Sequence, residues 1–377
     1  MNIHLVMHSV LSFVLPFRNT IIELSEDENY FYSLKESTSD WITSIEEKQL
    51  YEIAKKADRI FVHGLFQEHI NFISKFNKDK ARIIWIYYGF DADFFVSRQL
   101  FSVETHDLLV ERKLILRPII VKGAYYYQRF KRFVKIYFSK RANNKILDKI
   151  DIFAFWFFSD FKAIFPKDKD HYKFQFFFYS LGDQSLELSQ NANEDNLPDS
   201  IKSESLPVIL LGYSSNPINN HIDVLNSLKR INFKGQIICP LSYGGSPNYV
   251  KRIIDFGYSN FGESFKPLTS YIPFSEYKAL LLSCDIGIFN TYRQAGVGNI
   301  IQLLENGKTV YLSAKSPLYN YFNTIGCKVL SLNKLTKNNS SGLLQISTYD
   351  SRINRKIIEG IFNSANNANS IRNLLQS

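Results

Sequence analysis

The chain contains few of the residues that build cross-linked or metal-stabilised folds. It has three cysteines among 377 residues, Cys239, Cys284 and Cys327, at long spacings and with no CxxC pair. An odd number of widely spaced cysteines argues against a disulfide framework or a zinc knuckle. We therefore expect all three to be small buried residues in a reducing compartment.

Long apolar runs are also missing. No stretch of about 20 uncharged apolar residues occurs, so we expect no transmembrane helix. Residues 1–17 are apolar, but no Lys or Arg precedes Arg18, whereas a secretory signal begins with basic residues. These residues predict a buried first strand at 3–7. We expect a cytoplasmic protein or one associated with the cytoplasmic face of a membrane.

One segment has no acidic residue at all. Between Arg112 and Leu147 the chain carries eleven Lys and Arg and no Asp or Glu. Removing these eleven cations from the net charge of +9 leaves −2 for the rest of the protein. The protein is thus nearly neutral with a single basic segment, which disfavours nucleic acid as a partner.

What the sequence does contain is two similar halves. Apolar strands alternate with helical patterns in both, as at 59–63 and 82–88 in the first half and at 207–211, 235–240, 286–289 and 309–313 in the second. Strands that are apolar on both faces and alternate with helices indicate parallel sheets. Residues 183–206 are acidic and rich in Ser and Asn, which is typical of a linker.

These patterns predict an α/β protein with two Rossmann-like domains facing a cleft. We expect an N-terminal domain at 1–182, a linker at 183–206, a second domain at 207–350 and a C-terminal helical segment at 351–377. In the second domain, Asn216-Pro217 is typical of a helix start. A helix at 249–256 is expected to stop at Gly257, and another at 298–305 to end at Gly307.

Two loops of the second half are candidate ligand sites, because ligands bind at the carboxyl ends of parallel strands. The first loop runs from Arg293 to Asn299 and precedes a helix, so its glycines and the helix N-terminus suit a diphosphate. The second loop follows the strand at 207–211. The alternative for the first loop is an ordinary tight turn, and the alternative for the second is a solvated loop that caps a helix. The candidate residues are Gly212, Ser214, Asn219, His221, Tyr243, Arg293, Gln294, Gly296, Gly298 and Asn299.

Two candidate catalytic residues follow strands of the first half. His63 and Asp91 are positioned to supply a general base and its orienting partner. The alternatives are a hydrogen-bonded buried histidine and a helix-capping aspartate. Asp91-Ala92-Asp93 also matches the DxD motif, but this tripeptide is common by chance, so we expect no metal site.

The basic segment predicts an amphipathic helix. Tyr126, Phe130, Phe133, Val134 and Tyr137 fall on one helical face, flanked by Lys122, Arg129, Arg132 and Lys135. A basic helix with an aromatic face suits an anionic membrane surface. The alternative is an internal helix whose aromatic face packs on the sheet.

The stretch 208–325 resembles the bacterial dTDP-N-acetylfucosamine:lipid II N-acetylfucosaminyltransferases, the 4-alpha-L-fucosyltransferase-like glycosyltransferase family 56. The matching residues are Gly212-x-Ser214, Asn219-x-His221-Ile222, Pro240 with Tyr243, the run from Phe274 to Gly287, and Arg293-Gln294-x-Gly296-x-Gly298. In the first half, His63-Gly64-x-Phe66 and Trp85-x-x-x-Gly89-x-Asp91 match more thinly.

The resemblance implies a GT-B architecture, a dTDP-sugar donor on the second domain and an undecaprenyl-diphosphate-linked acceptor on the first. It implies a metal-independent transferase of enterobacterial common antigen synthesis with no cofactor. For such an enzyme, we expect the basic helix to provide the attachment to the inner face of the plasma membrane, where the lipid-linked substrate lies. The remaining alternatives are a nucleotide-sugar epimerase, a transferase with a soluble acceptor, and a non-enzymatic nucleotide-binding module.

Overall fold

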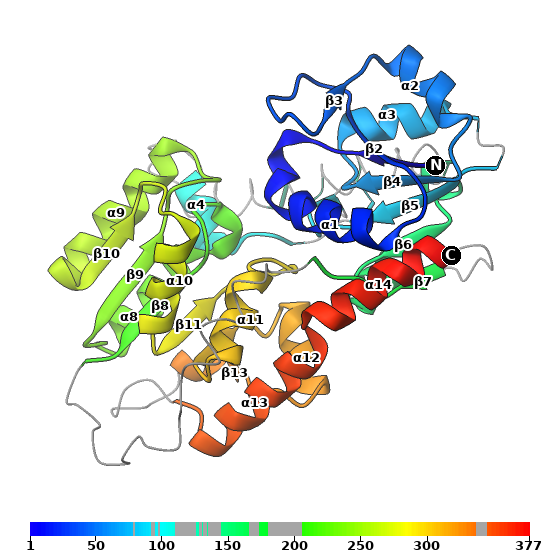
Figure 1. The fold of residues 1–377 in the computed structure, drawn as a ribbon. Helices are drawn as coiled ribbons and strands as arrows, with labels where there is room; N and C mark the ends of the chain where they lie inside the picture. The colour runs from blue at the N-terminus through cyan, green and yellow to red at the C-terminus, as the bar shows by residue number, and fades with distance from the viewer. Residues whose placement is uncertain are drawn as a thin grey trace. The chain divides into compact units, whose positions relative to one another are not determined.

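The protein folds into two compact units, each built on a parallel sheet (Figure 1). The computed structural model describes residues 1–77, 80–91, 95–96, 99–109, 126–127, 130, 134, 145–165, 173–179, 206–336 and 345–377. The first unit comprises Met1–Ser97, Phe133–Asp195 and Ile361–Ser377, and the second comprises Arg98–Arg132 and Asn196–Gly360.

The first unit has a sheet with the order β3-β2-β1-β4-β5-β6-β7, in which every pair is parallel. Its strands are β1 (Asn2–Leu5), β2 (Asn29–Ser33), β3 (Thr43–Ser44), β4 (Arg59–His63), β5 (Arg82–Ile86), β6 (Ile152–Ala154) and β7 (Lys173–Gln175). Its helices are α1 (Leu11–Leu24), α2 (Glu47–Ala54), α3 (Gln67–Lys75), α6 (Phe158–Ile164) and α14 (Ser364–Gln376). The strand order reverses between β1 and β4, where ligands of such sheets bind.

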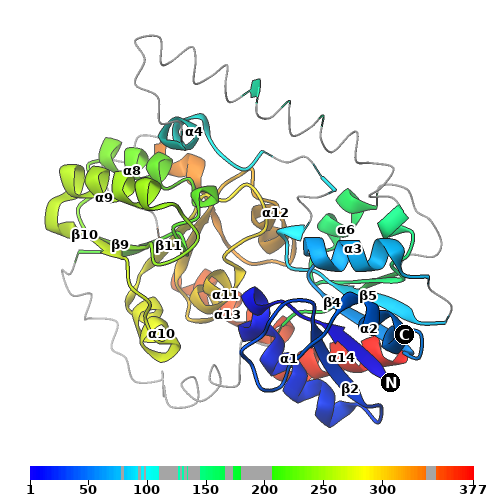
Figure 2. The ribbon, with the colours of Figure 1, turned by 90° about the horizontal axis from the view of Figure 1, so that it is seen from above.

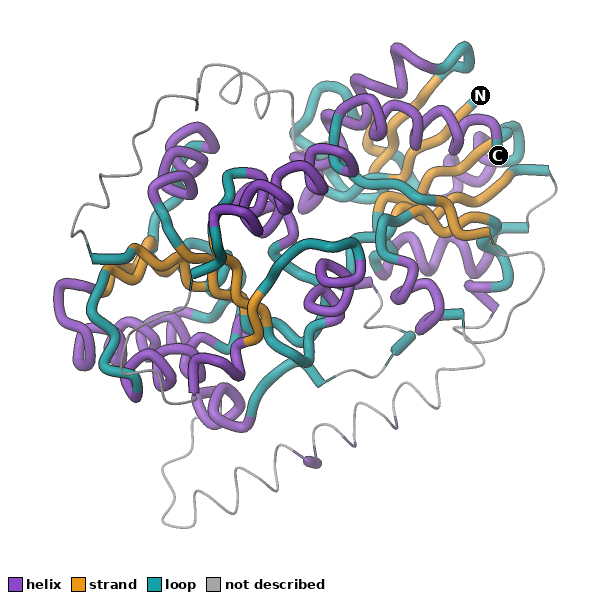
Figure 3. The backbone as a smooth tube through the Cα atoms, turned by 90° about the horizontal axis from the view of Figure 1, so that it is seen from below, coloured by secondary structure: helices purple, strands orange, loops and turns teal. Residues whose placement is uncertain are grey.

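The second unit has a parallel sheet with the order β10-β9-β8-β11-β12-β13. Its strands are β8 (Val208–Leu211), β9 (Gln236–Pro240), β10 (Phe265–Leu268), β11 (Ile286–Phe289), β12 (Thr309–Leu312) and β13 (Leu330–Ser331). Its α-helices are α4 (Val103–Leu109), α8 (His221–Arg230), α9 (Pro247–Phe261), α10 (Phe274–Ser283), α11 (Val297–Glu305), α12 (Pro317–Thr324) and α13 (Thr348–Ile361). Figure 3 shows helices on both faces of each sheet. Here the order reverses between β8 and β11.

The two expected α/β halves are confirmed, and the strands at 59–63 and 286–289 have the predicted bounds. The side chain of Asn216 accepts a hydrogen bond from the Ile218 N–H, as a helix cap would, but it starts only the short 3₁₀ helix Pro217–Asn219, and α8 begins at His221. Gly307 follows α11 with a φ of 69°, which confirms the predicted helix end. The three cysteines are buried, as expected.

The stop at Gly257 is wrong, because α9 continues to Phe261. A Cβ at Gly257 would lie 2.3 Å from Cδ1 of Phe265. This glycine therefore lets the helix pack closely on β10 and does not end the helix. A glycine inside a helix often has such a packing reason.

The expected C-terminal helical segment is confirmed and consists of two helices, α13 and α14. Asn363 caps the second of them, α14, by accepting a hydrogen bond from the Asn366 N–H. Ile371 and Leu374 of α14 are buried in the hydrophobic core of the first unit, and Figure 2 shows α14 beside α1. The end of the chain therefore completes the first unit.

Within the expected first domain at 1–182, α4 packs in the second unit, against α8 and α9. The hydroxyls of Ser102 and Thr105 donate to Oδ2 of Asp223, at 2.7 and 3.1 Å. The Arg252 guanidinium donates to the carbonyl of Leu108. These polar contacts bind a segment of the first half to the second unit.

The predicted basic helix is only partly covered by the structure. Tyr126, Tyr127 and Phe130 have helical backbone and side chains that are more than 60% exposed. The alternative in which Tyr126 and Phe130 pack on a sheet is therefore wrong. Lys122, Arg129, Arg132, Phe133, Lys135 and Tyr137 lie outside the described residues. Within the described part of the chain, no helix is long and apolar enough to cross a bilayer.

Candidate functional site

The carboxyl ends of β8, β9 and β11 carry the loops that contain the predicted donor-binding residues. These strands are neighbours in the sheet, so their loops meet at one edge. The Gly212 N–H donates to the carbonyl of Ile288 at 2.9 Å, and the Asn220 amide donates to the carbonyl of Asn290 at 2.8 Å. The structure thus brings together the two loops that the sequence indicated separately.

The β8 loop is held by a buried polar network. Gly212 has a φ of 72°, and a Cβ there would lie 3.0 Å from both Asn219 Oδ1 and His221 Nε2. The Asn219 amide donates to the carbonyls of Ser214 and Asn216, each at 3.0 Å. Ser214, Asn219 and His221 are all buried, so they fix the shape of the loop from beneath.

His221 is a buried core histidine and not a surface residue of its helix. Its Nδ1 lies 2.9 Å from the Tyr249 hydroxyl. Burial lowers the pKa of His221 to about 4, although the backbone of Ser214 opposes the shift. The ring is therefore neutral at physiological pH and supplies no charge to a ligand.

The β11 loop ends at the N-terminus of α11. Gly296 is the N-cap of α11 with a φ of 70°, and a Cβ there would lie 2.8 Å from Cδ1 of Tyr213. No side chain caps this terminus, so the N–H groups of its first turn, which contains Gly298 and Asn299, are available to an anion. Asn299 also donates to the Tyr277 hydroxyl at 2.7 Å.

Arg293 brings positive charge to the same place. Burial raises the pKa of Tyr213, and the nearby Arg293 guanidinium opposes the shift, which places Arg293 beside the β8 loop. Within the described part of the chain, Asn219 Oδ1, Thr291 Oγ1, Arg293 Nε and Gln294 Oε1 are buried polar atoms without a hydrogen-bond partner. Such atoms cost free energy unless a ligand satisfies them.

The β9 loop adds Tyr243, whose side chain is exposed at the same edge. Its carbonyl accepts hydrogen bonds from the N–H and hydroxyl of Ser215, at 2.9 and 2.6 Å. The Ser215 hydroxyl in turn accepts from the Gly245 N–H at 2.9 Å. Tyr213, Ser215 and Asn220 belong to the polar loop predicted after the strand at 207–211, and the structure places them at this edge with the candidate residues.

In the first unit, the predicted catalytic residue Asp91 is part of a buried hydrogen-bond network. Its carboxylate is fully buried and accepts hydrogen bonds from the N–H of Leu65, the indole of Trp85 and the N–H of Tyr88. Burial raises its pKa to about 6, and these hydrogen bonds oppose the shift. The carboxylate of Asp91 thus joins the ends of β4 and β5, and its catalytic role stays a prediction.

His63, the other predicted catalytic residue, is buried as well. Its side chain is fully buried, and its two nitrogens lie 3.2 Å from His4 Nδ1 and 2.9 Å from the Tyr179 hydroxyl. Burial lowers its pKa well below the ordinary value, and the nearby His4 contributes. Both nitrogens thus have side-chain partners in this structure, and a catalytic role of His63 stays a prediction. In the described part of the chain, no three His, Cys, Asp or Glu residues are grouped to bind a metal ion.

Solved structures with a similar fold include glycosyltransferases. A UDP-forming trehalose-phosphate synthase from Burkholderia xenovorans matches with a TM-score of 0.61 at 9% identity, over 100% of this chain and 99% of the other. Anabaena HepE in complex with UDP-glucose matches with a TM-score of 0.61 at 10% identity, over 100% and 99%. A glycosyltransferase from Rickettsia africae matches with a TM-score of 0.59 at 13% identity, over 100% and 96%.

The fold is therefore the GT-B fold, as the resemblance implied. Residues 164–368 match the family described as 4-alpha-L-fucosyltransferase, glycosyl transferase group 56. The match covers more than half of the chain and includes every loop of the candidate site in the second unit. The chain belongs to this family and is a glycosyltransferase.

Proposed function

We propose that the protein transfers a 4-acetamido-deoxyhexose, such as N-acetylfucosamine, from a dTDP-sugar to an undecaprenyl-diphosphate-linked oligosaccharide. The observation that carries the donor half is the uncapped N-terminus of α11 at Gly296, beside Arg293 and Tyr213. Membership of family 56 and the UDP-glucose bound by HepE support a nucleotide-sugar donor. The polyprenyl acceptor and the dTDP nucleotide rest on the resemblance alone.

In the proposed reaction, the N–H groups at the start of α11 and the Arg293 guanidinium bind the donor diphosphate. The acceptor hydroxyl oxygen forms a bond to the anomeric carbon while the bond from that carbon to the diphosphate oxygen breaks. The hydroxyl proton leaves to a base, and the nucleoside diphosphate departs with the electron pair. Fixed positive charge at Arg293 stabilises the negative charge that develops on the leaving group.

Donor turnover tests this function. Purified protein is given dTDP- and UDP-sugars, with and without an undecaprenyl-diphosphate-linked disaccharide, and nucleotide release is measured. We expect release that depends on the acceptor and is fastest with a dTDP-sugar. Nucleotide release that occurs only without the lipid acceptor would point to another GT-B activity. Release that is equally fast with soluble sugars as acceptors would point to the same conclusion. No release under any condition would overturn the transferase proposal.

We also propose that the basic segment attaches the enzyme to the inner face of the plasma membrane. The support is the exposure of Tyr126, Tyr127 and Phe130 in a segment with eleven cations and no acid. Replacing Lys122, Arg129, Arg132 and Lys135 by Glu should abolish sedimentation with anionic liposomes, because each cation near such a surface contributes about 1 kcal/mol. The matched control replaces four scattered lysines of the second unit, Lys229, Lys251, Lys266 and Lys328. Equal loss of binding in both variants would contradict the assignment.

A further inference from the structure

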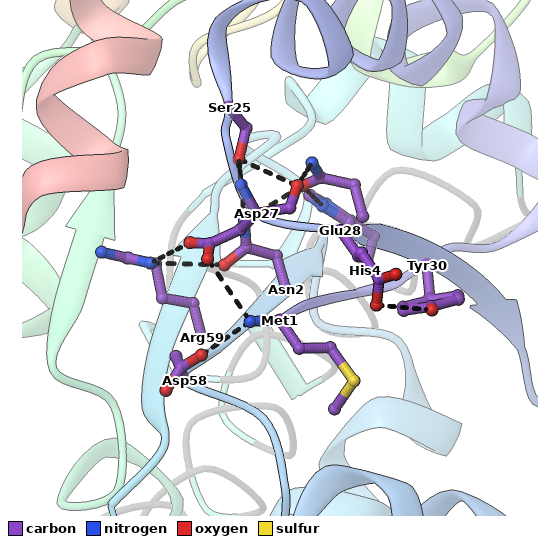
Figure 4. A network of polar contacts seen from close by, with 10 residues as sticks. Met1, Asn2, His4, Ser25, Asp27, Glu28, Tyr30, Asp58 and Arg59 are labelled. Atoms are coloured by element: carbon purple, nitrogen blue, oxygen red, sulfur yellow. Dashed lines mark hydrogen bonds and ion pairs between the residues drawn. The ribbon is translucent and has the colours of Figure 1, made fainter.

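The second unit presents an open tyrosine ring at the edge that carries the donor loops. Tyr243 follows β9 and is 61% exposed. Within the described part of the chain, its ring stacks on no other ring and its hydroxyl has no hydrogen-bond partner. Figure 4 shows the contrasting case of Tyr30, an exposed tyrosine of β2 whose hydroxyl donates to Glu28 at 2.8 Å. The Tyr30 ring also stacks on Tyr32, whereas the exposed ring of Tyr243 has no such local contact.

The backbone that carries Tyr243 is clamped onto the β8 loop. The Tyr243 carbonyl accepts both hydrogen bonds that Ser215 donates, and Ser215 holds the Gly245 N–H in turn. A Cβ at Gly245 would lie 2.3 Å from the Ser215 carbonyl oxygen, and Gly244 has a φ of 93°. The two glycines therefore let the β9 loop lie directly on the β8 loop. A ring on such a fixed backbone loses little further freedom when a ligand covers it, which favours binding.

The neighbours of Tyr243 place it beside the start of α11. Burial raises the pKa of Tyr243 to about 12, and the nearby Tyr213 adds to the shift. Burial also raises the pKa of Tyr277, and the nearby Tyr243 adds to that shift. Tyr213 is the ring that a Cβ at Gly296 would meet at 2.8 Å, and Tyr277 accepts the hydrogen bond from Asn299. The hydroxyl end of Tyr243 is thus enclosed near the proposed diphosphate site, although the residue as a whole is largely exposed.

The two sides of this site differ in the surfaces that they offer. Strand β9 lies on one side of the central pair β8 and β11, and β12 lies on the other. On the β12 side, residues 313–316 include no aromatic residue, and the Lys315 ammonium covers the Tyr292 ring at 4.6 Å. On the β9 side, the Tyr243 ring is open. The base and the sugar of a nucleotide-sugar lie at opposite ends of its diphosphate, so the open aromatic surface favours the planar base on the β9 side.

We infer that Tyr243 stacks on the base of the donor nucleotide, so that the donor lies with its base over β9 and its sugar toward β12. This inference rests on the proposed function, which puts the diphosphate at the start of α11. Stacking on an aromatic ring tolerates different bases. Tyr243 therefore contributes affinity for nucleoside diphosphates in general and does not by itself distinguish dTDP from UDP.

The test measures the Kd for dTDP by isothermal titration calorimetry in two variants of Tyr243. Tyr243→Leu removes the aromatic ring, and we expect it to raise the Kd about 10-fold, as the loss of one stacked base predicts. Tyr243→Phe keeps the ring and should change the Kd less than about 2-fold, because the ring supplies the stacking. An unchanged Kd in Tyr243→Leu would overturn the inference, and so would equal losses in both variants.

The matched control is Tyr349→Leu, which removes another exposed tyrosine of the second unit. Tyr349 is 72% exposed near the start of α13. The neighbouring Ser351 hydroxyl donates to the carbonyl of Gly307, which precedes β12, so this tyrosine lies at the opposite edge of the sheet. We expect no change in the Kd for dTDP. A loss equal to that of Tyr243→Leu would show that the effect is not specific to the base.

Two further ligands separate the base from the rest of the donor. Inorganic pyrophosphate has no base, so its Kd should be the same for the wild type and Tyr243→Leu. An equal loss of pyrophosphate and dTDP affinity would mean that the substitution disturbs the loop, which would contradict stacking. A loss seen with a dTDP-sugar but not with dTDP would assign the Tyr243 ring to the sugar and reject the proposed orientation.

A measurement without turnover separates this inference from the proposed function. In ligand-observed NMR, the Tyr243 ring should shift the base H6 resonance of bound dTDP or UDP upfield in the wild type and Tyr243→Phe, but not in Tyr243→Leu. This pattern would support the stacking even if no transfer is detected, in which case only the proposed transferase fails. Acceptor-dependent transfer together with the same H6 shift in all three proteins would leave the proposed function intact and reject the role of Tyr243.

Discussion

The two units share a topology but differ in what gathers at the edge where their strand order reverses. In the first unit this edge contains Tyr88, Tyr179 and neutral His63, with Asp91 buried beneath. In the second it contains glycines with positive φ, an uncapped helix N-terminus and Arg293. One sheet topology thus presents either uncharged or cationic groups at this edge, depending on the loops that follow its central strands.

The largest expected effect tests whether Asp91 belongs to the fold of the first unit. Asp91→Asn should destabilise the protein without changing dTDP affinity, because an amide nitrogen would face one of the three donors. The pKa of Asp91 in the folded protein is raised to about 6. Protonated Asp91 therefore stabilises the wild type at low pH, and this stabilisation is lost as the pH rises through 6. The cost of the substitution should therefore shrink from pH 4 to pH 7 by at most roughly 3 kcal/mol, as measured by urea unfolding.

The control for this experiment is Asp58→Asn, which changes an exposed carboxylate of the same unit. Asp58 pairs with the N-terminal amine at 2.6 Å, and this hydrogen bond lowers its pKa below the ordinary value. Its contribution is therefore complete above pH 4, and the cost of Asp58→Asn should stay constant up to pH 7. If the loss of unfolding free energy caused by Asp91→Asn also stays constant with pH, the pKa of the buried Asp91 carboxyl is not raised.

The next prediction tests whether the second unit binds an anion. Arg293→Ala should weaken dTDP binding about 30-fold, because a charge-assisted hydrogen bond contributes about 2 kcal/mol. Lys315→Ala removes another cation of this unit, which lies over the Tyr292 ring, and should change binding less than 2-fold. Isothermal titration calorimetry measures both. Equal affinities for the wild type and Arg293→Ala would remove Arg293 from the donor site.

The smallest effect concerns the shape of the β11 loop. Gly296→Ala places a Cβ at a φ of 70° and 2.8 Å from the Tyr213 ring, so we expect about 10-fold weaker dTDP binding from a strain of roughly 1–2 kcal/mol. Gly360→Ala, in α13, meets nothing within 4 Å and should leave binding unchanged. Thermal unfolding shows whether the variants remain folded. Tight binding by Gly296→Ala would mean that the loop does not need this conformation.

Much of the fold could be predicted from the sequence, because buried parallel strands are continuous apolar runs, as at β4 and β11. The short edge strands β3 and β13 could not, because two residues carry no periodicity. The role of Gly257 was predicted wrongly, because this glycine makes room for the Phe265 ring, which lies outside its own helix. Local patterns do not report such tertiary packing.

The donor loops could be predicted because glycines and polar residues after strands have a local signature. The chemistry of the first unit could not, because it depends on long-range contacts. Tyr179 is 116 residues from His63, and His63 is 59 residues from His4. Only the three-dimensional structure shows that His63 and Asp91 are enclosed.

The position of α14 has a consequence for how the protein is made. Its Ile371 and Leu374 belong to the same core cluster as Val14, Phe17 and Ile21, near the beginning of the chain. During synthesis, the second unit is complete before α14 has left the ribosome, whereas the first unit still lacks part of its core. A nascent chain halted before residue 364 would therefore expose an apolar strip on α1 to chaperones.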